Sequence, residues 1–91
     1  MLLTDKELLD QLKDLDGWDI NGKTIQKEIV KGHWREVISL ANAISDIAEA
    51  SCHHPELYLS FTKIKVSLTT HDAGGITNKD TAMAEKINQL L

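Results

Sequence analysis

The sequence predicts an α+β fold in which a four-stranded antiparallel sheet carries three helices on one face, in the order α-β-β-α-β-β-α. Two observations lead to this prediction. The spacing of apolar residues alternates between the helical period of 3.6 and the strand period of 2, and most of these changes coincide with glycine, Asn-Gly or proline signals. With 91 residues, of which 42% are hydrophobic and 26% charged, the chain is expected to form one domain over 1–91.

The first third of the chain predicts a helix followed by a hairpin. Thr4 and Glu7 have the spacing of a capping box, and four leucines then share one helical face before Gly17, so we expect a helix over about 5–15. Short alternating runs flank Asn21-Gly22, which is a strong hairpin signal. The predicted strands are 18–20 and 23–30.

The middle of the chain predicts a long helix over 34–51 that Pro55 follows. It carries two offset apolar stripes, one that begins at Trp34 and one that begins at Leu40. Two stripes indicate either a helix between the sheet and a second subunit or one broad core face, and both interpretations stay open.

The last third of the chain predicts a second hairpin and a third helix. Apolar residues change from odd to even positions near Thr62-Lys63, which places a turn there and strands at 57–61 and 64–70. Gly74-Gly75 marks a loop. Thr77 and Asp80 then have the spacing of a helix start.

Composition excludes several classes of function. Ten Lys and Arg against fourteen Asp and Glu give a net charge of −4 with no basic cluster, so we expect no direct binding to nucleic acid. No apolar run reaches the ~18–20 residues of a membrane span. Cys52 is the only cysteine, so no internal disulfide is possible and a cytoplasmic location is expected.

Three of the four histidines fall at predicted element boundaries. His53 and His54 follow the long helix, and His71 ends the fourth strand. Such a set suits elimination of water, because neutral imidazole accepts a proton and imidazolium donates one near pH 7. Three other interpretations stay open: a zinc site that includes Cys52, Cys52 as a nucleophile, and a favourable charge at the end of the helix.

Residues near the histidines favour a binding site. Glu49 lies one helical turn before His53, so an ion pair between these two side chains is expected. Phe61 would offer an aromatic wall to a flat heterocycle. Asp80 either caps a helix or contacts a histidine or substrate, and Thr69-Thr70 offer hydrogen bonds.

The pattern Glu49-x-x-x-His53-His54-Pro55, followed at fixed distances by Phe61, His71 and Asp80, resembles the signature of the pterin-4a-carbinolamine dehydratase family. The likeness centres on the stretch AEASCHHPELYLSFTKIKVSLTTHDAGGIT and includes the upstream Gly17-Trp18. The predicted order of elements is also similar to the order in that family.

The resemblance implies a lyase that dehydrates 4a-hydroxytetrahydropterin, the product of aromatic amino acid hydroxylation, to quinonoid dihydropterin. It implies that His53 and His71 are the acid and base and that His54 chiefly binds and orients the pterin. It implies a pocket bordered by Glu49, Cys52, Pro55, Phe61, Thr69, Thr70, Asp72 and Asp80. No metal or organic cofactor is expected, because an amino lone pair expels the hydroxyl group once that group is protonated.

The resemblance also leaves other functions open. The family forms dimers and tetramers through helices, so a homodimer or homotetramer is expected. Some relatives act as dimerisation partners of a transcription regulator, and a pterin-binding role in another pathway is a further alternative. Cys52 departs from the Asn or Asp that relatives commonly carry, and Ile29-Val30-Lys31 replaces a segment that is usually more aromatic.

Overall fold

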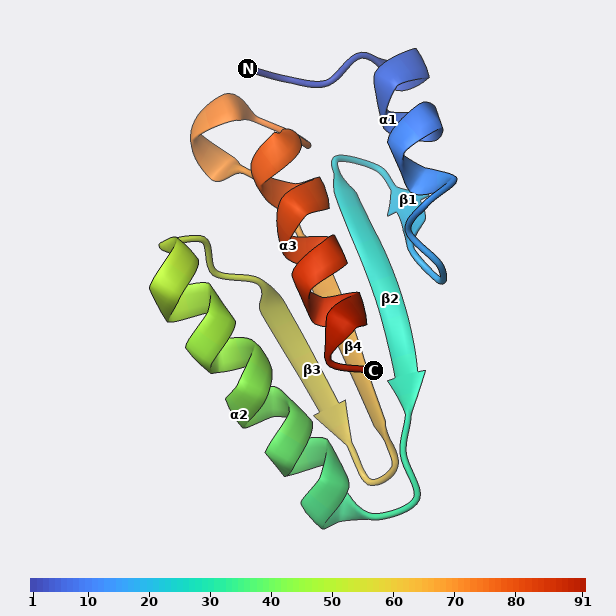
Figure 1. Cartoon of the computed structure of the whole chain (residues 1–91), viewed down its shortest axis with the longest axis vertical. Helices are drawn as coiled ribbons and strands as arrows, with labels where there is room; N and C mark the ends of the chain where they lie inside the picture. The colour runs from blue at the N-terminus through green and yellow to red at the C-terminus, as the bar shows by residue number, and fades with distance from the viewer.

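The computed structural model describes all residues, 1–91, and confirms the predicted fold class and order of elements. Figure 1 shows the helices and strands. A short 3₁₀ helix, η1, which the sequence pattern did not indicate, precedes the last helix. The bounds are α1 (Asp5–Leu12), β1 (Asp19–Asn21), β2 (Thr24–Val30), α2 (Trp34–Ser51), β3 (Glu56–Ser60), β4 (Lys63–Leu68), η1 (His71–Ala73) and α3 (Asn78–Gln89).

The four strands form one antiparallel sheet in the order β1-β2-β4-β3, so β3 lies at an edge. Ile25 of β2 lies opposite Leu68 of β4, and Leu57 of β3 lies opposite Val66. Because side chains alternate between the two faces of a strand, this register brings the apolar side chains of β2, β3 and β4 to the same face.

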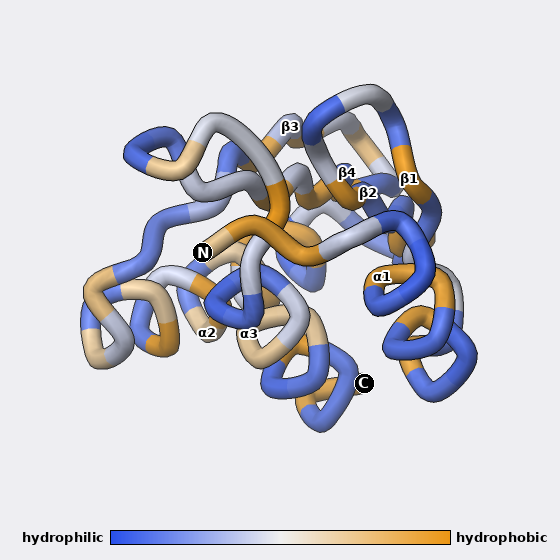
Figure 2. The backbone as a smooth tube through the Cα atoms, turned by 90° about the horizontal axis from the view of Figure 1, so that it is seen from above, coloured by the Kyte–Doolittle hydropathy of each residue, from blue (hydrophilic) through white to orange (hydrophobic).

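The three helices cover that apolar face of the sheet (Figure 2). Between the two layers lies one hydrophobic core, to which the sheet contributes the fully buried Ile25, Ile64, Val66 and Leu68. The long helix α2 contributes Val37 and Ile44, and α3 contributes Met83 and Ile87. None of the helices is both long and apolar enough to cross a membrane.

Helix α1 begins as predicted and ends earlier than predicted. The Thr4 side chain accepts from the backbone N–H of Glu7, and the Glu7 carboxylate accepts from the backbone N–H of Thr4, which completes the capping box. These hydrogen bonds lower the pKa of Glu7. The helix ends at Leu12, and successive turns then carry the chain to the buried Leu15.

A polar cluster holds the segment after α1 against the end of α3. The buried Trp18 donates its indole N–H to Asn88 Oδ1 at 3.0 Å, and Lys27 Nζ donates to the same oxygen at 2.9 Å. Lys27 also donates to the carbonyl of Asp16. The φ of Gly17 is +84°, a conformation that favours glycine, and a Cβ atom there would lie 2.8 Å from the flexible end of the Lys27 side chain.

Both hairpin turns differ from their predicted positions by one residue. Asn21 pairs with Thr24, so Gly22-Lys23 forms the first turn. Gly22 has a φ of +61° and Lys23 does not have a positive φ, as in type II′ turns, whereas the type I′ turn that Asn-Gly usually forms needs two positive φ values. Phe61-Thr62 forms the second turn.

Helix α2 has the predicted bounds, and its end sets the direction of the segment that follows it, His53-His54, which we call the histidine segment. Cys52 follows the helix with φ 50° and ψ 39°, a left-handed conformation that no other non-glycine residue in the chain adopts. Its backbone N–H donates to the carbonyls of Ala48 and Glu49. In this conformation the Cβ atom of an L-residue lies too close to the backbone, which costs about 1–2 kcal/mol.

The strain at Cys52 predicts that Cys52→Gly raises the free energy of unfolding by about 1 kcal/mol, because glycine adopts a positive φ without this penalty. Urea unfolding of the wild type and the variant measures the change. Cys52→Ala is the matched control, since it removes the thiol and keeps the strained Cβ atom. A Gly variant no more stable than the Ala variant would show that the left-handed conformation carries no cost here.

Candidate functional site

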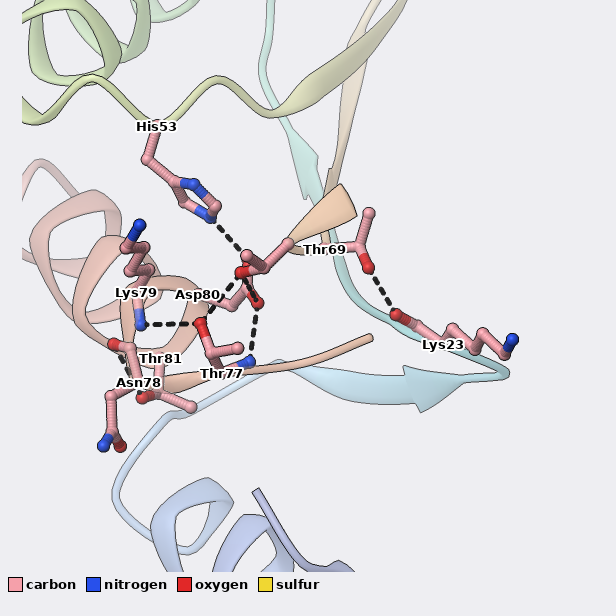
Figure 3. A network of polar contacts seen from close by, with 9 residues as sticks. Lys23, His53, Thr69, Thr77, Asn78, Lys79, Asp80 and Thr81 are labelled. Atoms are coloured by element: carbon pink, nitrogen blue, oxygen red, sulfur yellow. Dashed lines mark hydrogen bonds and ion pairs between the residues drawn. The ribbon is translucent and has the colours of Figure 1, made fainter. Parts of the chain in front are cut away.

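A buried carboxylate on α3 is the centre of the candidate site. Asp80 is fully buried and accepts three hydrogen bonds, which Figure 3 shows. Thr70 Oγ1 and the backbone N–H of Thr77 donate to Oδ2, at 2.8 and 2.9 Å. Nε2 of His53 lies 2.6 Å from Oδ1. The carboxylate therefore joins the segment after α2, the segment after β4 and the start of α3.

Asp80 fulfils both of the roles that its sequence position left open. It is the third helical residue of α3 and completes a capping box with Thr77, and its other oxygen contacts His53. The Thr77 hydroxyl accepts from the backbone N–H of Lys79 and lies 2.8 Å from the Thr70 hydroxyl. Because the Thr70 proton is donated to Asp80, the Thr77 hydroxyl donates its own proton to Thr70.

The contact with Asp80 selects one tautomer of His53. An ionised carboxylate only accepts hydrogen bonds, so the proton of the neutral imidazole lies on Nε2. Nδ1 then carries the free lone pair and is the atom that can accept a proton from a bound molecule. The His53 side chain is 12% exposed, so the base is nearly buried and only a small part of its ring reaches the surface.

Glu49 pairs with His54, which corrects the expected pair with His53. Glu49 Oε1 lies 2.7 Å from Nε2 of His54, and both side chains are largely exposed. The reason is the left-handed conformation of Cys52, which ends the helix before His53, so the spacing of four residues no longer places Glu49 and His53 on one helical face.

The segment between β4 and α3, in which His71 begins η1, lies at the same end of the molecule as the end of α2 (Figure 1). His71 is the first residue of η1 rather than the last residue of a strand, and its side chain is exposed. The preceding residue, Thr70, shares Asp80 with His53. The structure therefore brings the backbone of His71 close to His53 through one buried carboxylate.

Some of the other residues of the predicted pocket lie beside the histidines, and others lie away from them. Pro55 and Glu49 line a small cavity with His54, and Asp72 is exposed in η1. Phe61 is 73% exposed and lies in the β3–β4 turn, at the opposite end of β3 from the histidines (Figure 1). Thr69 donates to the carbonyl of Lys23 and points away from His53 (Figure 3).

Separate cavities flank the histidine segment. One, of about 250 Å³, lies beside His53 between the end of α2 and α3 and is lined by Ser51, His53, Lys79, Ala82, Met83 and Lys86. The other, of about 140 Å³, lies beside His54 between α2 and β3 and includes Glu49, Pro55 and Leu57. His53 and His54 thus line different cavities, as adjacent side chains on a non-helical backbone often do.

No group of three or more His, Cys, Asp or Glu side chains is arranged to hold a metal ion. The acidic and imidazole groups instead form two separate pairs, one buried and one exposed. On β3, Tyr58 donates a hydrogen bond to Glu56, and this bond and the Glu56 charge raise the pKa of Tyr58.

Three residues of this region were not predicted as site residues. Thr77 is buried in the Asp80 network, and its capping-box spacing was the signal for that position. Lys79 and Lys86 line the cavity beside His53. Their spacing of seven residues places them on one side of α3, but only the packing of α3 against the end of α2 brings that side to His53.

Comparisons with known proteins identify the family of the chain. The family model for pterin 4 alpha carbinolamine dehydratase matches residues 1–90. A candidate pterin-4-alpha-carbinolamine dehydratase of Aquifex aeolicus is 45% identical over 98% of this chain and 90% of its own length. A similarly named protein of Sulfurisphaera tokodaii is 39% identical over 98% of this chain and 96% of its own length.

Two solved structures share the fold. A transcriptional coactivator/pterin dehydratase from Brucella melitensis superposes with a TM-score of 0.94 at 29% identity, over 99% of this chain and 98% of that one. A pterin dehydratase-like protein identified as a RuBisCO assembly factor has a TM-score of 0.69 at 19% identity over 81% and 88%, a likeness of fold alone. With the family match over residues 1–90 and relatives as similar as 45%, the chain belongs to the pterin-4a-carbinolamine dehydratase family.

Proposed function

We propose that this protein dehydrates 4a-hydroxytetrahydropterin to quinonoid dihydropterin by histidine acid–base catalysis, with no metal or organic cofactor. The observation that carries the proposal is the Asp80 network, which orients His53 and joins it to the residue before His71. The family match and the names of the relatives support the same reaction.

In the proposed mechanism His53 is the base. Nδ1 accepts a proton from a ring nitrogen of the substrate, and the lone pair left on that nitrogen forms a C=N bond at C4a. The imidazolium that results is stabilised by Asp80, which lies 2.6 Å from the opposite ring nitrogen. An aspartate that fixes a histidine tautomer and stabilises its charged form is the arrangement found in catalytic triads.

In the same step His71 is the acid. The bond between C4a and oxygen breaks, and the hydroxyl leaves as water with a proton from His71, so one proton is taken up by the protein and one is released. The exposure of His71 lets it exchange protons with solvent and return to its starting form. His54, next to Glu49, binds and orients the pterin ring.

The proposal predicts that His71→Ala lowers kcat/KM for dehydration by about 10²–10⁴-fold, because one proton transfer loses its donor. Stopped-flow decay of the carbinolamine at neutral pH, corrected for the spontaneous reaction, measures the change. The variant should unfold at the same urea concentration as the wild type, since the side chain is exposed.

His33→Ala is the matched control for this experiment. His33 is also exposed, makes no capping hydrogen bond and lies at the start of α2, at the other end of that helix from His53. Its removal should leave turnover unchanged. A folded His71→Ala variant with wild-type turnover would refute the proposed acid.

A homo-oligomer built on α2 is part of the proposal. The chain buries Val37, Ile44 and Ala48 of the first apolar stripe but leaves Trp34 46% exposed and Ile38 only partly covered. A partner subunit would remove this surface from water, with a gain of about 25 cal/mol for each Å² of apolar area.

Light scattering of the purified protein is therefore expected to give a mass of two or four times 10.2 kDa. Trp34→Ser/Ile38→Ser should lower that mass, whereas Asp46→Ser, at another exposed position of α2, should not. A monomeric wild type would contradict self-assembly. It would favour the second candidate function, in which α2 binds a different protein, as the coactivator name of the Brucella relative suggests.

A further inference from the structure

The cavity beside His53 carries an uncompensated positive charge. Lys79 and Lys86 line it from α3, two helical turns apart, which separates them by about 10 Å along the helix axis. Neither lysine forms an ion pair, because the only lysines that pair with carboxylates are Lys13 and Lys63. The Lys86 ammonium instead donates to the neutral hydroxyl of Ser51 at 3.1 Å.

No exposed carboxylate neutralises this cavity. None of its lining residues is acidic, and Asp80, which contacts the His53 ring, is fully buried and already accepts three hydrogen bonds. The acidic Glu85 lies on a different side of α3. There it lines a separate cavity together with Asp14, which follows α1 in the chain. The orientation of α3 about its own axis thus produces a locally positive site in a chain whose net charge is −4.

We propose that the cavity between Lys79 and Lys86 binds a phosphate group on the side chain of the pterin substrate. This inference rests on the proposed function and specifies its substrate class as pterins with a phosphate monoester. A phosphate carries a charge of about −1.5 to −2 at pH 7 and offers three acceptor oxygens. Lysine ammonium groups bind such anions as point charges.

The dimensions and neighbours of the cavity fit this ligand. Its volume of about 250 Å³ holds a phosphate together with part of an alkyl side chain, for which Ala82 and Met83 provide an apolar floor. His53 is a wall of the same cavity. In Figure 3 the Lys79 side chain extends along the side of α3 that faces His53. A pterin ring at His53 therefore has its side chain within reach of both lysines.

A matched pair of unreactive, fully aromatic pterins tests the proposal. One carries a neutral trihydroxypropyl side chain, and the other carries the same side chain as its terminal phosphate. Quenching of pterin fluorescence in a phosphate-free buffer of low ionic strength measures both Kd values. For the wild type we expect the phosphorylated probe to bind about tenfold more tightly, an advantage that shrinks in 0.5 M NaCl because salt screens exposed charges.

Two double variants with the same change in net charge show where the advantage arises. Lys79→Gln/Lys86→Gln should reduce the ratio of the two Kd values to about one. Lys6→Gln/Lys63→Gln removes two exposed lysines outside the cavity, one on α1 and one at the start of β4, and should keep the tenfold ratio. All four lysines are exposed, so the variants are expected to fold.

Equal affinities of the wild type for the two probes would overturn the substrate class and leave the proposed dehydratase intact. A ratio that survives in Lys79→Gln/Lys86→Gln would overturn the assignment to this cavity. Inorganic phosphate, added as a competitor, should weaken the binding of the phosphorylated probe and leave the binding of the neutral probe unchanged. If neither pterin binds, the proposed function fails together with the inference.

Discussion

The site depends on the satisfaction of one buried charge. An ionised carboxylate removed from water costs several kcal/mol unless hydrogen bonds replace its hydration. Asp80 has no exposure, and it meets this requirement with the Thr70 hydroxyl, the Thr77 N–H and the His53 ring. Each donor comes from a different segment, so the same requirement that stabilises the fold holds the parts of the site together.

The capping box of α3 and the orientation of His53 are therefore one structure. Helix starts leave backbone N–H groups without partners, and the Asp80 side chain satisfies one of them with Oδ2. Its Oδ1 remains free to accept from His53. A helix-capping residue thus becomes a positioning residue because it is buried beneath the segment that leaves α2.

The two carboxylate–histidine pairs differ in environment, and this difference suits their proposed roles. The His53 and Asp80 side chains are 12% and 0% exposed, whereas those of His54 and Glu49 are 61% and 79% exposed. Exposed pairs contribute roughly 0–1 kcal/mol and rearrange easily. The buried pair gives a fixed base, and the exposed pair can adapt to a ligand.

Local patterns predicted the elements, and long-range packing decided their details. The bounds of α2 follow from its apolar period and from Pro55, and the capping box at Thr77 follows from spacing. The strand order could not be predicted, because β2 pairs with β4 across the whole of α2. The predicted pairing of Glu49 with His53 was wrong because Cys52 adopts a left-handed conformation that its residue type does not favour. The cavity beside His53 depends on the docking of α3, which no local signal reports.

The central claim is that Asp80 holds His53 as the Nε2–H tautomer and leaves Nδ1 as the base. Nitrogen NMR of the protein with ¹⁵N-labelled histidine, at a pH where the ring is neutral, tests it most directly. The account predicts a His53 spectrum with a protonated Nε2 and an unprotonated Nδ1. A His53 proton on Nδ1, or a tautomer mixture like that of the exposed His33, would contradict it.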